Sequence, residues 1–94
     1  MEDLILVKKI DPNDKSDELY IVSFGISNIQ DEKVANKVSE ALKNFDYINR
    51  DSVIFRYNGI ELRIAIKYIP ELIKALVEEG IGLYSVFIKY ETLY

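Results

Sequence analysis

The side chains that perform most enzymatic chemistry are poorly represented in this chain of 94 residues. It contains neither histidine nor cysteine, which excludes imidazole bases, thiol nucleophiles and nearly all zinc and copper sites. Ser27 follows Gly25 with the spacing of a nucleophile elbow, but Ile29 stands where the second glycine belongs. The close glycines Gly80 and Gly82 lack the Gly-Lys-Ser/Thr ending of a phosphate-binding loop. We therefore expect no catalytic residue and no enzymatic activity.

Metal ligands would have to come from carboxylates, several of which lie in the polar segment of residues 11–18. Asp11 and Asn13 match the first and third ligands of a calcium-binding loop, but the positions of three further determinants do not match. Those positions hold Lys15, Ser16 and Val22. The carboxylates of Asp11, Asp14 and Asp17 also fail to predict a magnesium site, because acidic residues on a polar loop are typical of a solvated turn. We expect no metal ion and no other cofactor.

The composition indicates one small domain. The length suits a single core, and 49% of the residues are apolar. Apolar runs reach about four residues, as in residues 4–7, whereas a membrane span needs roughly 20. A chain without cysteine fits a reducing compartment, and a net charge of −4 disfavours nucleic acid as a partner. We expect a soluble, cytoplasmic protein that does not itself insert into a membrane.

The N-terminal 18 residues are expected to stand apart from the domain that follows. Residues 4–10 are typical of a short strand, and the turn formers of residues 11–18 are typical of a linker. A buried strand is predicted over residues 19–24, ending at Gly25. Behind an N-cap at Asp31, apolar residues recur at helical spacing and predict an amphipathic helix of roughly four turns. These residues are Val34, Val38, Ala41, Leu42 and Phe45.

The dipeptide Asn58-Gly59 predicts a tight β-hairpin between residues 53–57 and 60–68. Both residues tolerate the positive φ that a two-residue loop of this kind demands. The resulting register gathers apolar side chains on one face and an ion pair on the other. The predicted pairs are Tyr57 with Ile60, Phe55 with Leu62, Val53 with Ile64, and Arg56 with Glu61.

A second helix is predicted by Pro70 in its first turn, Glu71 beside it and Gly80 as its stop. Its apolar stripe comprises Leu72, Ile73, Leu76 and Val77. A last strand covers residues 83–90. The order strand, helix, strand, strand, helix, strand over residues 19–94 predicts an α+β, ferredoxin-like βαββαβ domain, with both helices on one face of an antiparallel sheet. The strand that precedes the linker is an addition to this pattern.

Two surfaces of the predicted sheet bear on function. The outward residues on the third strand of the domain are Glu61, Arg63, Ala65 and Lys67. None is aromatic, whereas an RNA-recognition domain stacks bases on aromatic side chains, so we expect no nucleic acid partner. The last strand is apolar on both faces although it is an edge in this topology. It carries the candidate interaction surface, which comprises Tyr84, Val86, Ile88 and Tyr90. The N-terminal strand, a second copy of the chain or another protein could cover it.

Four segments in the second half of the chain carry a family resemblance. They are residues 57–62 (YNGIEL), 69–81 (IPELIKALVEEGI), 83–86 (LYSV) and 91–93 (ETL). In these segments the chain resembles the small C-terminal domain of ABC-transporter ATP-binding subunits of the bacitracin and lantibiotic export and resistance type. That family has a helix of the form Pro-x-Leu-hydrophobic-x-x-Leu-x-x-x-Gly-Ile/Val, followed by a strand and a Ser/Thr-Leu-Glu-Asp-x-Phe-Leu box.

The box would begin at Thr92, and the sequence ends at Tyr94 before its acidic residues, which fits either an excised domain or a free-standing relative. No residue matches the family's ATP-binding machinery. The resemblance implies a non-catalytic accessory or regulatory domain that makes protein–protein contacts. The implied partners are the transporter's ATPase core or its permease, and the implied place is the cytoplasm, at the inner face of the membrane through that complex.

Two alternatives stay open. One is a free-standing interaction or inhibitor protein that forms a homodimer. The other is an ACT-like module that senses a small molecule, such as an amino acid, at a strand–helix junction near Gly25 or Gly80.

Overall fold

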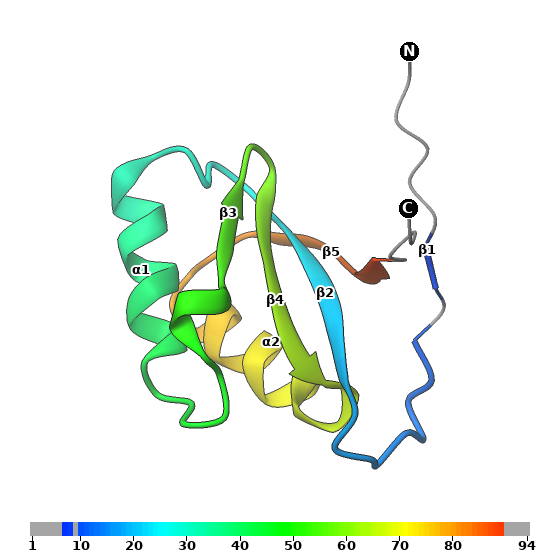
Figure 1. The fold of residues 1–94 in the computed structure, drawn as a ribbon. Coiled ribbons are helices and arrows are strands. Elements are labelled where there is room, and N and C mark those ends of the chain that lie inside the picture. Colours follow the sequence, from blue (N-terminus) through cyan, green and yellow to red (C-terminus); the bar gives the residue numbers. More distant parts are fainter. Residues whose placement is uncertain (1–6, 9, 90–94) are drawn as a thin grey trace.

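The computed structural model describes residues 7, 8 and 10–89, and in this part of the chain an antiparallel sheet is combined with two α-helices (Figure 1). The strands are β1 (Val7–Lys8), β2 (Leu19–Ile26), β3 (Ile54–Arg56), β4 (Gly59–Ala65) and β5 (Leu83–Lys89). The helices are α1 (Glu32–Leu42) and α2 (Ile69–Glu78), and short 3₁₀ turns occupy Arg50–Ser52 and Ile66–Tyr68. The α+β class expected from the sequence is confirmed.

The strands lie in the order β1-β5-β2-β4-β3, and every neighbouring pair is antiparallel. The two longest ladders join β2 to β4 and β2 to β5, so β2 lies in the middle of the sheet. Of the predicted N-terminal strand, residues 4–6 and 9 fall outside the described residues. The part that is described, β1, pairs through Val7 and Lys8 with Lys89 and Ile88 of β5.

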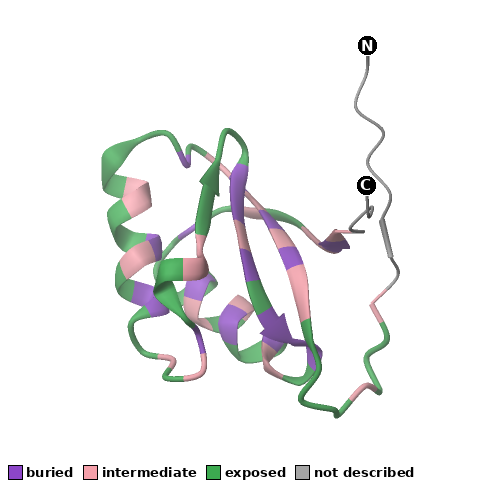
Figure 2. Cartoon of the chain, in the orientation of Figure 1, coloured by how far each residue is buried: buried purple, intermediate pink, exposed green. Residues whose placement is uncertain are grey.

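One apolar core lies between the sheet and the two helices. Alternate residues of β2 and β4 point into it, among them Phe24 and Leu62, while α1 contributes Val38 and α2 contributes Leu72. All four are at most 1% exposed. Figure 2 shows this burial as stripes along the central strands and along one side of each helix. Because both helices bury their apolar stripes in the same cluster, they cover the same face of the sheet.

Helix α1 begins where the sequence indicates and ends earlier than predicted. The side chain of Asp31 caps it by accepting a hydrogen bond of 2.9 Å from the backbone N–H of Lys33. The helix has 11 residues, which is about three turns. After Leu42 the backbone bonds tighten to three-residue spacing, as when Phe45 N–H donates to the Leu42 carbonyl. Phe45 therefore packs against the core from a loop.

Helix α2 ends as predicted, in a closed C-terminal cap. Gly80 has φ +78°, a left-handed conformation that glycine adopts without strain. Its N–H donates to the carbonyl of Val77, and the N–H of Ile81 donates to that of Leu76. These two bonds form a Schellman motif, which satisfies carbonyls that the helix end would otherwise leave unpaired.

The predicted hairpin forms, but its two-residue loop lies one residue earlier than predicted. Each residue of β3 therefore pairs with a β4 residue two positions closer to the loop than expected. The observed pairs are Ile54 with Glu61, Phe55 with Ile60, and Arg56 with Gly59. The loop is therefore Tyr57-Asn58, and neither Asn58 nor Gly59 has a positive φ. Gly59 is a strand residue, and a Cβ added to it would overlap the backbone of Phe24, whose carbonyl carbon would be 2.9 Å away. This glycine is required by the close approach of β4 to β2 rather than by the turn.

Candidate functional site

The four residues of the interaction surface predicted on the last strand do not form one exposed surface. Tyr84 is 80% exposed, but Val86 is half-buried and Ile88 is only 3% exposed. Tyr90 lies outside the described residues. Val86 and Ile88 stand opposite Phe24 and Val22 of β2 and face the core.

An irregularity in β5 explains this correction. Gly25 pairs with Ser85 and Ile26 pairs with Leu83, so Tyr84 has no partner and forms a β-bulge. The bulge shifts the alternation of side chains, which separates Tyr84 from the core-facing residues that follow it. The polar Ser85 and Lys89 carry a signal that could have revealed the true core side, because they alternate with Val86 and Ile88.

The sheet has a second surface, opposite the helices, which we call the helix-free face. Its side chains come from β2, β3, β4 and β5 and alternate with the core positions. Its central part comprises Ile21, Ser23, Ile54, Arg56, Glu61, Arg63, Phe87 and Lys89. Ile21 and Phe87 are half-buried, and Ile54 is 47% exposed. The face thus mixes apolar side chains with charged ones.

Glu61 connects three strands of the helix-free face. One of its carboxylate oxygens, Oε2, lies 3.3 Å from Nε of Arg56 on β3 and 3.3 Å from Nζ of Lys89 on β5. The Glu61 side chain is only 12% exposed. The Lys89 side chain reaches the Glu61 carboxylate by crossing over β2. At that point β2 carries Ser23, which pairs with Glu61 on one side and with Phe87 on the other, and the small serine side chain leaves room for the lysine. The ion pair between Arg56 and Glu61 expected from the sequence is present, although the two residues are diagonal rather than opposite.

The helix-free face is positively charged within an acidic chain. Among the residues just named, Arg56, Arg63 and Lys89 are cationic and Glu61 is anionic, a formal charge of +2. The chain as a whole has a net charge of −4. The excess of negative charge therefore lies elsewhere in the chain, and an acidic partner would meet a favourable charge on this face.

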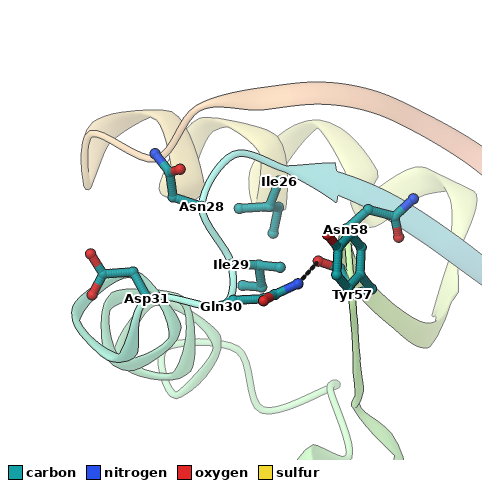
Figure 3. A pocket seen from close by; sticks show the side chains of 7 residues that line it. All are labelled: Ile26, Asn28, Ile29, Gln30, Asp31, Tyr57 and Asn58. Carbon is teal, nitrogen blue, oxygen red and sulfur yellow. Dashed lines mark hydrogen bonds between the residues drawn. The ribbon is translucent and has the colours of Figure 1, made fainter.

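A hollow of ≈ 410 Å³ lies where β2 runs into α1, next to the β3–β4 loop (Figure 3). It is open to solvent. Its lining residues are Ile26, Asn28, Ile29, Gln30, Asp31, Tyr57 and Asn58. Ile26 and Ile29 are buried side chains at its base, whereas Asn28, Gln30 and Asn58 supply amide groups. Its volume falls in the range of small-molecule sites, although such sites are usually more enclosed and more apolar.

Two features hold the shape of this hollow. The side-chain N–H of Gln30 donates to the backbone carbonyl of Tyr57 at 3.3 Å and ties the loop before α1 to the hairpin (Figure 3). Asn28 adopts a left-handed φ of 58°, which asparagine tolerates better than most residues. A second hollow of ≈ 290 Å³ lies beside Asn28 and is lined partly by Gly80. The strand–helix junction named from the sequence is therefore a real concavity.

Three aromatic rings from two segments pack together beside α2. Tyr47 stacks on Tyr68 with ring centroids 3.9 Å apart and planes inclined by 14°, and Phe45 lies 5.5 Å from Tyr47. The hydroxyl of Tyr47 donates to a Glu71 carboxylate oxygen at 3.1 Å. Burial and this hydrogen bond raise the pKa of Tyr47 well above its usual value near 10. The cluster anchors the loop between α1 and β3 to the start of α2.

The raised pKa of Tyr47 predicts a loss of stability in alkaline solution. The unfolded chain releases this proton near pH 10 while the folded chain retains it, so the free energy of unfolding falls as the pH rises above about 10. Tyr20 adds to the fall, because its hydrogen bond to Glu18 raises the pKa of Tyr20 to about 12. Tyr47→Phe should cost about 1 kcal/mol at neutral pH and should flatten the alkaline fall, as measured by urea unfolding at a series of pH values. Superimposable pH profiles for the two proteins would contradict this account.

Within residues 7, 8 and 10–89, no group of three or more acidic, histidine or cysteine side chains could hold a metal ion. No helix in the same residues is long and apolar enough to cross a membrane. Comparison with models of protein families, with curated proteins and with solved structures found no significant match.

Proposed function

We propose that this chain is a ferredoxin-like, non-catalytic accessory domain that contacts the ATP-binding subunit or the permease of a bacitracin- or lantibiotic-type exporter. The strand order supports the fold assignment, because β2 and β4, the first and third strands of the domain, lie between β5 and β3. Two interleaved βαβ units produce this arrangement. The segments at residues 57–62, 69–81 and 83–86 support the family assignment.

The observation that carries the proposed contact is the charge and composition of the helix-free face. Arginine and aromatic side chains are enriched at protein interfaces, and here Arg56, Arg63 and Phe87 lie on the same face of the sheet as Ile21 and Ile54. The partner surface should accordingly present carboxylates around an apolar centre. Such complementarity accelerates association and selects the partner.

Isolation of the native protein from cells that carry its gene tests this function. An antibody against the chain should recover a polypeptide with Walker motifs, either joined to the chain or bound to it, together with ATPase activity. Arg63→Glu should lower recovery of a separate partner by about ten-fold or more, since it places a like charge against an acidic surface. Lys33→Glu is the matched control, because Lys33 is exposed on α1 and lies outside the helix-free face. Recovery of the 10.9 kDa chain alone, without any ATP-binding polypeptide, would refute the proposal.

A second candidate function, small-molecule sensing as in ACT-like modules, is favoured by the hollow at the β2–α1 junction. Its amides and the Asp31 carboxylate could bind the two charged groups of an amino acid. An amino acid present at about a hundred times its dissociation constant should stabilise the fold by ~2.7 kcal/mol, which corresponds to a rise in melting temperature of roughly 10–20 °C for a domain of this size. Gln30→Ala should abolish the rise if the hollow is the site. A melting temperature unchanged by every amino acid would eliminate this function.

A further inference from the structure

The strand β3 ends the sheet on the side away from β1, and all three of its residues are exposed. Ile54 is 47% exposed on the helix-free face, and Phe55 is 44% exposed on the helix side. In the part of the chain that the structure describes, no strand pairs with its outer edge. Natural edge strands usually carry proline, bulges or several charges that prevent pairing. Here Arg56 is the only charge on the strand.

A hollow lies beside this edge, between β3 and α1. It measures ≈ 220 Å³ and is lined by Ser39, Leu42, Arg50, Asp51, Val53 and Phe55. A half-exposed phenylalanine and an adjacent hollow lined by both apolar and polar side chains therefore occupy the same patch of surface. In a two-fold symmetric interface each copy presents the same patch to the other. A side chain that projects from the patch of one copy can therefore occupy the hollow in the patch of the other copy, and the reverse.

We propose that two copies of the chain pair through β3, antiparallel about a two-fold axis at Phe55, with Phe55 of each copy packed at the hollow of the other. The pairing would join two sheets into one and leave all helices on the same side. It uses a different surface from the helix-free face proposed to contact a transporter subunit, so the two proposals can fail separately.

The side chains of β3 select this register among the three that a two-fold axis allows. An axis at Arg56 would place two guanidinium groups directly opposite each other, which is destabilising. An axis at Ile54 would leave the Phe55 rings without each other as partners. An axis at Phe55 pairs the two rings across the strands, where aromatic pairs are favourable, and places each Arg56 opposite an isoleucine.

Sedimentation velocity at increasing protein concentration tests the association. The native chain should shift from 10.9 kDa to twice that mass, and Phe55→Asp should weaken dimerisation by about thirty-fold or more, as for a central interface residue. Tyr84→Asp is the matched control, because this aromatic residue is 80% exposed on β5 and should leave the dimer unchanged. Circular dichroism shows whether each variant is folded. A native chain that stays monomeric at all concentrations would overturn the proposal.

Introduced cysteines test the register, since the chain has no cysteine of its own. Directly opposed residues in an antiparallel pair have Cα atoms about 4.5–5.5 Å apart, which suits a disulfide. With the axis at Phe55, residue 54 of one copy stands opposite residue 56 of the other, so a mixture of Ile54→Cys and Arg56→Cys chains, both of which keep Phe55, should be cross-linked into a dimer by mild oxidation. Ile54→Cys alone places the two thiols on diagonal positions about 7–8 Å apart and should cross-link poorly. Equal cross-linking of the two samples, or none in the mixture, would contradict pairing about Phe55.

Discussion

Replacing Gly59 with alanine is expected to lower the free energy of unfolding by about 3 kcal/mol or more, the upper part of the range for an overpacked interior position. The added Cβ would overlap the carbonyl group of Phe24, and this obstacle is backbone in the middle of the sheet. Backbone cannot rotate away as a flexible side chain can, so β4 would have to move off β2. Urea unfolding of the purified variant measures the change.

Gly80→Ala is the comparison that separates a steric effect from a conformational one. Nothing lies within 4 Å of a Cβ at Gly80, but the residue has φ +78°, where alanine is strained by about 1 kcal/mol. Gly80→Asn should recover part of that loss, because asparagine tolerates the left-handed region. If Gly59→Ala proved no more destabilising than Gly80→Ala, the close approach of β4 to β2 would not be the reason for this glycine.

Leu76→Ala is expected to destabilise the fold by 2–5 kcal/mol, the range for a large-to-small change at a buried leucine. Leu76 is 0% exposed in the core, and its carbonyl accepts the bond that closes the end of α2. The carbonyl remains in the alanine variant, so the loss reports the cavity left by the side chain. Chemical denaturation should show an earlier midpoint with little change in slope.

Val77→Ala provides the matched control on the same helix. Val77 is 56% exposed, and a surface change of this kind should alter the free energy of unfolding by no more than about 0.5 kcal/mol. The apolar stripe predicted from the sequence included Val77, which the structure instead places at the surface. Similar losses for the two variants would contradict that placement.

The order and type of the main elements could be predicted from the sequence because local chemistry specifies them. Asp31 caps a helix by its own side chain, and Gly80 ends one by its own backbone conformation. Apolar periodicity identified most of the buried side of each helix; in α2 the predicted Leu72 and Leu76 are buried, whereas Val77 is 56% exposed. These determinants act within a few residues, so no knowledge of the tertiary structure is needed.

The errors arose where contacts between distant segments decide the geometry. In the sequence Gly59 follows Asn58 and indicates a turn glycine. In the structure it must be glycine because a Cβ atom at this position would overlap the backbone of Phe24, which is far away in the sequence. The bulge at Tyr84 depends on pairing with Gly25 and Ile26. Neither partner is visible in the local sequence, so the register of the hairpin and the bulge in the last strand could not be obtained from it.

The helix-free face was only partly predictable for the same reason. Glu61 and Arg63 were identified as outward residues from the alternation of one strand. Lys89 and Ile21 join them only because β2 lies between β4 and β5. The bridging of Arg56 and Lys89 by one carboxylate therefore depends on the strand order, which the alternation of a single strand does not reveal.

The pairing of β1 with β5 has a consequence for how this domain can be joined to other polypeptides. Val7 stands opposite Lys89, so the two ends of the described chain meet at the edge of the sheet farthest from β3. Domains whose ends lie close together tolerate insertion into, or attachment to, another protein. Another polypeptide attached at this edge would lie at the side of the sheet opposite β3 and would leave the β3 edge uncovered.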